Sequence, residues 1–464
     1  MSCWKAIWVG CLFFVAAAIS TSAQTFTIVA YDGDGFTLIS SLVQGRDGNL
    51  YGTQTDNDIA NYYGSVFKVT SSGTLTVLHT FCPQLDCVAG AYPGPLMLGT
   101  DGNFYGVAGW GGITTGACGS SGCGTIFKMT TGGTVAVLHT FSGPDGIYPN
   151  GLIEGSDGNF YGTAANGGGS GSACSCGTIF KITPAGVFTT LHKFGGAGEG
   201  SGPTGLVQGI DGNLYGTTYG GGKYDPYSCQ PYGGCGTVFK STTGGAFTTL
   251  HSFQFTDGAV LYAPVAQASD GTFYGTTWEG PTGGTVFSIT SQGEAKTVYD
   301  FAGIGANPIV GLIPASDGNL YGTLVEGGGD CGDGSVYSVS EGGVFTTVYD
   351  SCQYGGYTSA LVQDTSGKFY GSGGPSIYSL DTGLGPFVTF VVPAAKVEQT
   401  VQILGQGLTG AAAVTFNGIA AAKFTVVSDT FMTAVVPSGA TTGPVVVTTP
   451  SGALTSNVSF RIIH

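Results

Sequence analysis

One six-residue stretch recurs seven times along the chain and sets the period that any fold must accommodate. It reads Asp47-Gly48-Asn49-Leu50-Tyr51-Gly52 at its first occurrence and ends as the degenerate stretch 366–371. The copies start at positions 47, 101, 157, 211, 270, 317 and 366, so neighbouring copies lie 47 to 59 residues apart. This period is typical of a tandem array of small β units and is too long for a helical hairpin.

Each repeat contains four strand-like runs, which we call a to d in chain order. Run a is short and apolar. The Asp-Gly pair after it is expected to supply the positive φ angles of a tight hairpin turn into run b, Leu/Phe-Tyr-Gly-Thr. Runs c and d, such as 177–183 and 187–192, are rich in β-branched and aromatic residues. Four strands in about 50 residues predict one blade of a β-propeller.

The two ends of the array are out of phase with the repeats. Residues 25–31 form a run d with no repeat before it, and the seventh repeat stops at run c, residues 376–380. We therefore expect residues 25–31 to pair antiparallel with 376–380, because this clasp would remove the exposed sheet edges of an open array. The prediction is an all-β chain with a seven-bladed β-propeller over residues 24–381, closed by its N-terminal strand.

The first 23 residues are expected to be a signal peptide. Lys5 precedes an apolar run over 6–19, and small residues follow up to Ala23. An uncleaved anchor is the alternative. The expected location is secreted or at the cell surface, with the periplasm as an alternative.

Ten cysteines remain after the signal, most of them closely spaced, and disulfides are the expected use in an oxidising compartment. Zinc is the rival interpretation, but it needs two close pairs brought together, whereas these lie one per repeat. The expected bridges are Cys82–Cys87, Cys118–Cys123, Cys174–Cys176, Cys229–Cys235 and Cys331–Cys352.

The Asp-Gly-Asn-aromatic-Tyr-Gly-Thr repeats resemble the GloVer tandem repeat of exported bacterial proteins. They are also similar to the blades of two-component-regulator propellers, which carry Trp where this chain has Tyr. The resemblance covers about residues 25–380. It implies the fold and carries no assigned activity.

Residues 386–464 lack the repeat and resemble an IPT/TIG domain, an immunoglobulin-like β-sandwich. The resemblance rests on Gln402–Leu408, Val414–Gly418 and two strand-like stretches at 434–437 and 443–447. Short strands broken by Gly and Pro at these intervals are typical of a sandwich. Because the last propeller strand ends opposite the long loops, we expect this domain to lie on the side away from them.

Charge excludes two partner classes. Only 9% of residues are charged, the formal net charge is −15, and the C-terminal domain has just three cations, Lys396, Lys423 and Arg461. Nucleic acid and anionic lipid surfaces need clustered Lys and Arg, so neither is an expected partner. No segment after the signal is expected to span a membrane.

The residues that recur in every repeat are expected to be structural. The tyrosine of run b should pack between blades, and the aspartate of Asp-Gly should form the turn, since one acid per blade cannot bind calcium. Four histidines share one position in run d, the outermost strand, and are expected at the surface or between blades: His79, His139, His192 and His251. No hydrolase, zinc-protease or phosphate-loop motif occurs, so no metal and no cofactor are expected.

The residues that vary between repeats, just after run b, are the site candidates. Aromatic and amide side chains there would suit a polyol such as a sugar, or a surface protein: Trp110, Asn166, Tyr219 and Trp278. The expected function is a non-catalytic binding protein. One alternative is a carbohydrate-active hydrolase or lyase that uses the nearby acids Asp56, Glu279 and Glu326, and another is a purely structural surface protein.

Overall fold

The structure is built almost entirely of β-strands. This computed structural model describes residues 24–31, 38–39, 42–55, 63–82, 87–169, 176–223, 229, 233–302, 308–327, 334–350, 359–373 and 376–463. These residues form forty strands and one short 3-10 helix, η1 (Gly116–Cys118). Within this part of the chain, no helix has the length and apolar character that a bilayer crossing requires.

The four runs of each repeat all form strands. The a strands are β2 (Leu38–Ile39), β3 (Val43–Gln44), β7 (Ala91–Pro93), β8 (Met97–Leu98), β12 (Ile147–Glu154), β16 (Gly200–Gln208), β20 (Ala266–Gln267), β24 (Ile313–Pro314) and β28 (Val362–Gln363). The b strands are β4 (Leu50–Thr55), β9 (Phe104–Trp110), β13 (Phe160–Asn166), β17 (Leu214–Gly221), β21 (Phe273–Thr277), β25 (Leu320–Leu324) and β29 (Phe369–Gly373). The c strands are β5 (Ser65–Val69), β10 (Thr125–Met129), β14 (Thr178–Ile182), β18 (Thr237–Ser241), β22 (Thr285–Ile289), β26 (Ser335–Val339) and β30 (Ser376–Asp381). The d strands are β6 (Leu75–Thr80), β11 (Val135–Thr140), β15 (Phe188–Lys193), β19 (Phe247–Ser252), β23 (Ala295–Asp300), β27 (Phe345–Asp350) and β1 (Thr25–Tyr31).

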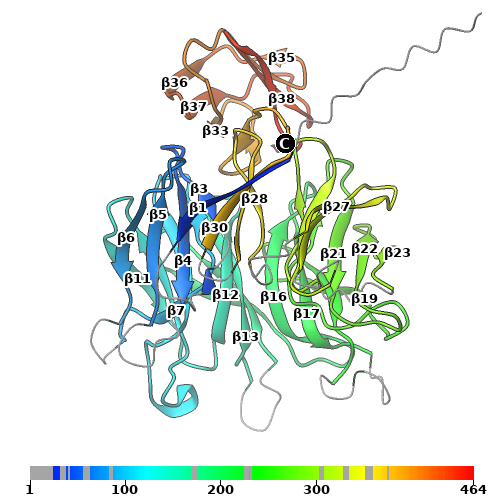
Figure 1. Ribbon diagram of the computed structural model, residues 1–464. Coiled ribbons are helices and arrows are strands. Elements are labelled where there is room, and N and C mark those ends of the chain that lie inside the picture. The colour runs from blue at the N-terminus through cyan, green and yellow to red at the C-terminus, as the bar shows by residue number, and fades with distance from the viewer. Residues whose placement is uncertain are drawn as a thin grey trace, which may run out of the picture.

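The strands of each repeat form one antiparallel sheet in the order a-b-c-d, and the described residues up to 381 contain seven such sheets. The first strand of the chain, β1, takes the d place beside the last repeat's β30, with Phe26 opposite Leu380 and Ile28 opposite Tyr378. The predicted pairing of residues 25–31 with 376–380 is therefore confirmed. In Figure 1, β1 lies alongside β30.

Two further contacts join the start of the described chain to its last two repeats. The ring of Phe26 stacks on Tyr349 with centroids 4.4 Å apart and planes 3° apart. The Gln44 amide donates to Thr365 Oγ1 and accepts from the Thr365 backbone N–H, both at 3.0 Å. Contacts over more than 300 residues of sequence require the array to curve back on itself.

The Asp-Gly turns differ in detail from the prediction. Only the glycines adopt positive φ, between 75° and 98°, while the aspartates before them stay at negative φ. In the first turn the Gly48 N–H donates to Gly45 O at 3.1 Å, and the Gly45 N–H donates to Asn49 O at 2.8 Å. The turn is thus a type I turn followed by a left-handed glycine, so the expectation that both residues of the pair carry positive φ was wrong.

The glycine of the Tyr-Gly-Thr run has a different role, which is close packing. A Cβ at Gly52 would lie 2.7 Å from Phe67 Cζ of the neighbouring c strand, and one at Gly106 would lie 2.6 Å from Phe127 Cζ. Phe67 and Phe127 are fully buried. The missing side chain therefore makes room for a large aromatic in the core of each sheet.

The C-terminal residues form a separate β unit, which we call the C-terminal module (residues 386–463). Its strands are β31 (Thr389–Phe390), β32 (Ala394–Lys396), β33 (Thr400–Leu404), β34 (Ala413–Phe416), β35 (Ile419–Ala420), β36 (Phe424–Ser428), β37 (Phe431–Val435), β38 (Val445–Thr449), β39 (Gly452–Thr455) and β40 (Arg461–Ile463). They make two four-stranded sheets, β31-β33-β37-β36 and β35-β34-β38-β39, and β32 pairs parallel with β40. A core that includes Ile403, Phe416, Met432 and Val447 lies between these sheets.

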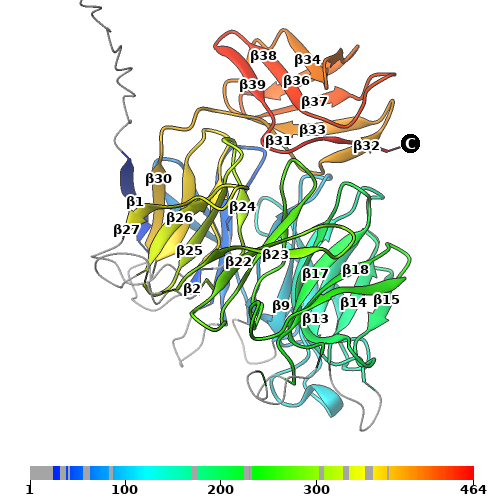
Figure 2. The same ribbon diagram turned by 90° about the vertical axis from the view of Figure 1, so that its right-hand side faces the viewer.

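The module packs against the a–b turns of the first repeats. Arg46 donates from Nη2 to Gln402 Oε1 at 2.6 Å and to Thr100 O at 2.7 Å, and its guanidinium lies 4.7 Å from the centre of the Phe431 ring. Thr430 Oγ1 donates to Arg46 O at 2.7 Å. Figures 1 and 2 show the module on one side of the repeat sheets and η1, in the b–c loop of the second repeat, on the other. The predicted placement away from the long loops is therefore confirmed.

Candidate functional site

The recurring tyrosines pack between neighbouring sheets, as predicted. The Tyr51 ring lies 4.2 Å from Phe104 of the next sheet, and three further pairs repeat the contact at 4.1 to 4.3 Å: Tyr105–Phe160, Tyr215–Phe273 and Tyr321–Phe369. The Tyr51 hydroxyl donates to Asp47 Oδ2 at 2.9 Å, and the same bond recurs in four other repeats. Each aspartate therefore both shapes its turn and holds the tyrosine, a second role that sequence reasoning missed.

Strand c adds a lysine to this group in several repeats. Lys128 lies 2.7 Å from Asp101, and Lys240 lies 2.8 Å from Asp211. Burial alone would raise the pKa of Asp101, but hydrogen bonds from Lys128, Asn103 and Tyr105 outweigh it and lower that pKa to about 2. Asp211 has the same balance, with its pKa lowered to about 2. These carboxylates are fully engaged, so they are structural and offer nothing to a substrate.

The histidines of the d strands also pack between sheets. His139 stacks on Phe188 of the next sheet with centroids 3.8 Å apart, and its Nε2 lies 2.9 Å from Asp145 Oδ2. His192 repeats the stack with Phe247 at 4.0 Å. The inter-blade role is confirmed for these two. Among the described residues, no group of three or more His, Cys, Asp or Glu side chains could hold a metal ion.

Three of the predicted disulfides are present: Cys82–Cys87, Cys118–Cys123 and Cys229–Cys235. Cys176 is also disulfide-bonded, but its expected partner Cys174 lies outside the described residues. Cys331 and Cys352 lie outside them too, so their bridge stays a prediction. The confirmed bridges follow strands b or d, which places them on the side opposite the module.

The candidate Trp110 ends strand β9 on this loop side. Its ring lies 4.5 Å from Tyr92 of β7, and Tyr92 lies 6.1 Å from Tyr63. Trp110 keeps 40% of its surface exposed. Tyr92 has a φ of +56°, a costly conformation for a bulky residue, and this backbone aims its ring.

A second aromatic cluster occurs three repeats further on. Tyr262 lies 5.1 Å from Tyr219 and 5.5 Å from Trp278, and 40% of Tyr262 is exposed. The sequence pattern predicted Tyr219 and Trp278 as binding residues. It did not predict Tyr262, which lies between them, or Tyr92 of the first cluster. The signal was present: both tyrosines follow a run d and come shortly before a proline, Pro93 or Pro264.

The remaining candidates are Asn166, Glu326, Glu279 and Asp56. Asn166 is exposed at the end of β13, and Glu326 is exposed after β25. Glu279 is half-buried, and its backbone pairs with Ala259. Asp56 lies outside the described residues. A hydrolytic pair of these acids therefore stays a prediction.

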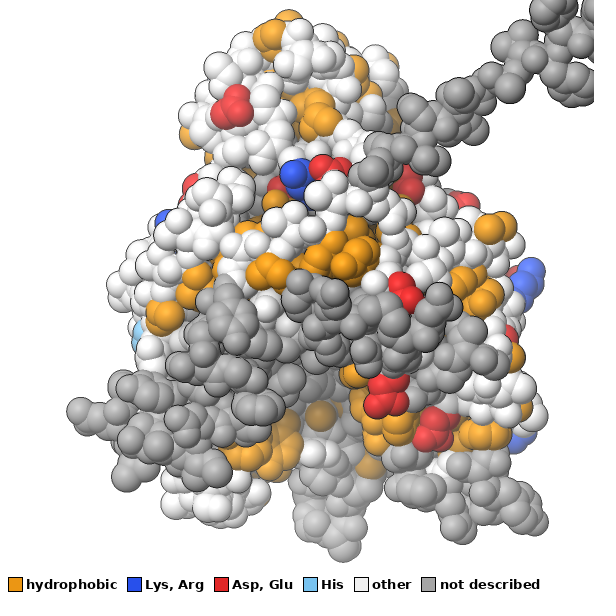
Figure 3. Space-filling view, in the orientation of Figure 1, with side chains coloured by type: hydrophobic (Ala, Val, Ile, Leu, Met, Phe, Trp, Pro, Cys, Tyr) orange, Lys and Arg blue, Asp and Glu red, His pale blue; other side chains and the backbone are white. Residues whose placement is uncertain are grey.

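One hollow lies on the other side of the molecule. A cavity of about 660 Å³, which we call the central cavity, is enclosed by the a strands of all seven sheets and by one edge of the module. Each sheet contributes at least one half-buried apolar residue to it from an a strand, and these include Val43, Met97, Ile153, Val207, Ala266, Ile313 and Val362. The module contributes Phe390, Val391 and four residues near its end, Asn457, Val458, Ser459 and Arg461. On the face drawn in Figure 3, charged side chains are few, and hydrophobic ones form a band below the module.

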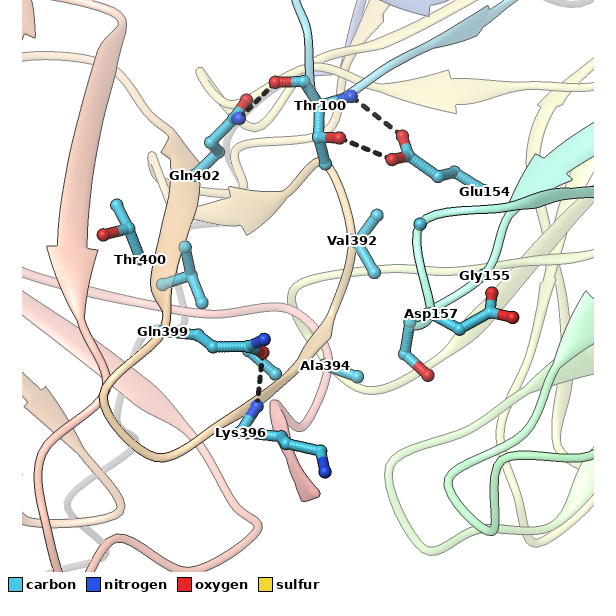
Figure 4. Close-up of a pocket in the computed structure, with 14 residues that line it drawn as sticks. Thr100, Glu154, Gly155, Asp157, Val392, Ala394, Lys396, Gln399, Thr400 and Gln402 are labelled. Carbon is cyan, nitrogen blue, oxygen red and sulfur yellow. Dashed lines mark hydrogen bonds between the residues drawn. The ribbon is translucent and has the colours of Figure 1, made fainter. Parts of the chain in front are cut away.

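A second hollow of about 530 Å³ lies beside it, between the turns of the second and third repeats and strands β32 and β33 (Figure 4). Several of its polar groups bind one another. Both Glu154 oxygens accept from Thr100, at 2.8 Å from its N–H and 2.5 Å from its hydroxyl, while Gln402 donates to Thr100 O. Burial raises the pKa of Glu154 despite these bonds. This hollow is the joint between the repeats and the module.

Sequence comparison identifies the repeats. The profile of the Gloeobacter/Verrucomicrobia repeat matches residues 10–226, 112–303 and 227–387. No curated protein matches the sequence.

Several solved structures are similar in fold. An extracellular domain assigned to a hybrid two-component system of B. thetaiotaomicron aligns with a TM-score of 0.51 at 9% identity, over 96% of this chain and 60% of that one. PorZ, a surface component of the type-IX secretion system of Porphyromonas gingivalis, aligns with a TM-score of 0.47 at 13% identity, over 90% of this chain and 58% of that one. A gluconolactonase of Xanthomonas campestris aligns with a TM-score of 0.41 at 14% identity, over 79% of this chain and 92% of that one.

Proposed function

The chain belongs to the Gloeobacter/Verrucomicrobia repeat family, and on that premise we propose that it is an exported, non-catalytic binding protein. Its recognition surface is the loop side, where the b–c and d–a connections lie, and its ligand is a carbohydrate. The module covers the opposite side and leaves the loops free to meet a partner.

The proposed architecture is a seven-bladed β-propeller over residues 24–381, preceded by a signal peptide at 1–23 and followed by an IPT/TIG immunoglobulin-like domain at 386–464. Support comes from the seven a-b-c-d sheets, from the pairing of β1 with β30 and from the two packed sheets of the module. The fold shared with an extracellular domain agrees with it. An extracellular or cell-surface location is supported by the disulfides.

The observation that carries the proposal is the pair of loop-side aromatic clusters. In each one, an aromatic ring that is 40% exposed is held by neighbouring rings: Trp110 by Tyr92, and Tyr262 by Tyr219 and Trp278. A ring that is fixed before binding loses little entropy when a sugar stacks on it. Exposed aromatic area on connecting loops of a rigid scaffold is where recognition sites concentrate.

A glycan array probed with the purified protein tests the proposal. Trp110→Ala and Tyr262→Ala should each weaken binding of any captured glycan about 5- to 150-fold, which corresponds to roughly 1–3 kcal/mol for a stacked ring by analogy with base stacking. Tyr262 is preferred to Trp278 because Trp278 packs into a buried cluster with Phe253 and Val260, so its loss would also destabilise the fold.

Val344→Ala is the matched control, since Val344 is 67% exposed in a c–d turn on the module side. It should bind like the parent. If glycans bind the parent and both aromatic variants equally, the loop-side clusters are not the site. If the array captures nothing, carbohydrate is the wrong partner class, and a surface protein becomes the leading candidate.

A further inference from the structure

The central cavity has walls that a sugar would not recognise. From its a strand, each sheet presents at least one half-buried apolar side chain to it. Its volume of about 660 Å³ falls within the range of small-molecule sites. A polyol in such a space would lose its hydrogen bonds to water without replacing them.

Polar side chains do line the cavity, but those from the repeats are already bound to neighbouring sheets. Gln208 accepts from the Ser156 N–H at 2.9 Å and donates to Gly212 O at 3.0 Å. Gln267 and Gln363 make the equivalent bonds to Ile210 and Ser316, and Gln44 makes them to Thr365. The Glu154 carboxylate is bound to Thr100. The repeats therefore present an apolar wall with its polar groups turned to structural partners.

The module supplies a different chemistry on one side. Arg461, half-buried, lines the cavity and donates from Nη2 to Ser156 Oγ at 2.7 Å. Among the described residues, Arg461 forms no close ion pair, and the Asp211 carboxylate in the turn of the fourth repeat acts on its guanidinium only at longer range. The Asn457 Oδ1 atom is buried and has no hydrogen-bond partner, and Ser459 lies between the two in sequence. A half-buried cation without a close counter-ion and a buried acceptor without a donor both cost free energy, and a ligand that satisfies them would recover it.

From this arrangement we infer that the central cavity binds a single-chain amphipathic acid, with its alkyl chain among the seven apolar side chains and its head group at Arg461. An ionised carboxylate satisfies the guanidinium, and a protonated or hydroxylated head group can also donate to Asn457 Oδ1. Each methylene buried among the apolar side chains should strengthen binding about 4-fold. This site is independent of the loop-side clusters, since it lies on the module side of the repeats.

Titration calorimetry with dodecanoate on the full-length mature protein tests the inference. We expect one molecule bound per chain, and dodecanol at least about 10-fold weaker because it lacks the charge-assisted bond to Arg461. Arg461→Met should weaken dodecanoate about 10-fold or more while leaving dodecanol unchanged. Ser156→Ala is the control: it removes the bond between Arg461 and the repeats but keeps the charge, so it should bind dodecanoate like the parent.

A second variant fills the cavity. Ala266→Phe places a ring where equivalent strands carry Met97 or Ile153, and it should abolish binding of both ligands. Ala266→Val, the residue found at three equivalent positions, should bind nearly as the parent does. If Ala266→Phe lowers the melting temperature, the Arg461→Met and Ser156→Ala pair still decides the head-group assignment.

Three outcomes overturn the inference. They are no heat with dodecanoate, equal affinity of parent and Arg461→Met for it, or binding to phosphatidylglycerol vesicles without binding of free dodecanoate. The last would indicate a membrane surface contact in place of an internal site. Glycan binding should be unchanged by Arg461→Met, so failure here and failure of the loop-side proposal are distinguishable.

Discussion

Replacing Gln44 by leucine tests whether side-chain bonds hold the first repeat to the last. The Gln44 amide makes two hydrogen bonds of 3.0 Å to Thr365, one to its N–H and one to its hydroxyl. Thr365 is fully buried, and Gln44 is 6% exposed. Leucine has a similar volume, so it removes both bonds with little change in packing.

The expected cost has two parts. Two lost hydrogen bonds account for about 2 kcal/mol in total, and the buried N–H left unpaired adds roughly 1–3 kcal/mol, less what the new apolar burial returns. We therefore expect Gln44→Leu to lower the free energy of unfolding by about 2–4 kcal/mol. The assay is urea unfolding, in which the midpoint of Gln44→Leu is compared with that of the parent. The slope of the free energy of unfolding against urea concentration should be unchanged.

Gln267→Leu is the matched control. It loses two equivalent bonds, to Ile210 N and Gly271 O, but the bond to Ile210 is solvent-exposed, so water can replace it. We expect a cost of about 1–2 kcal/mol there, less than for Gln44. Equal midpoints for the two variants, or a Gln44→Leu midpoint equal to the parent's, would refute the argument that a buried bond joins the ends of the array.

Deleting residues 24–31 should expose the edge of β30 and cause aggregation in size-exclusion chromatography, and a soluble, monomeric deletion variant would contradict this. The lowered pKa values of Asp101 and Asp211, about 2 each, mean that these groups stabilise the fold above their ordinary pKa of 3.8 and lose that contribution as pH falls toward about 2. Urea midpoints should therefore fall more steeply across this window in the parent than in an Asp101→Asn, Asp211→Asn double variant, and parallel curves would count against it. Peptide mapping without reduction should recover the three disulfides already described, and free thiols at Cys331 and Cys352 would rule out the fifth predicted bridge.

Much of the repeat fold follows from local pattern. The period of the Asp-Gly stretch predicted the four strands of each sheet, and the orphan run at 25–31 predicted its partner strand. These features depend on residues close together in sequence: alternating apolar side chains, a glycine that can take positive φ, and a tyrosine four residues after its aspartate. Local sterics decide them whatever surrounds the repeat.

Features that join distant segments were not predictable in this way. A glutamine or glutamate stands three residues before the turn position in five repeats, Gln44, Glu154, Gln208, Gln267 and Gln363, and the pattern is visible in the sequence. Its partner, however, is the turn of the preceding sheet. Likewise, Tyr92 joins its loop-side cluster because the pairing of β7 with β9 places it beside Trp110, and Tyr262 joins the other because the preceding repeat brings Tyr219 to it.

The sequence by itself determined the strand order within each repeat, the closing strand, the roles of the repeated Tyr and His, and the side on which the module lies. Only the tertiary structure decided that the module rests on the turns of the first repeats, with Arg46 under Phe431 and Arg461 against Ser156, and that a cavity with one cationic side lies beneath it. The physical reason is that a hairpin is specified by neighbours in sequence, whereas docking depends on which surfaces meet after the array has closed. The repeat pattern of the sequence therefore does not specify which surfaces of the repeats and the module come into contact.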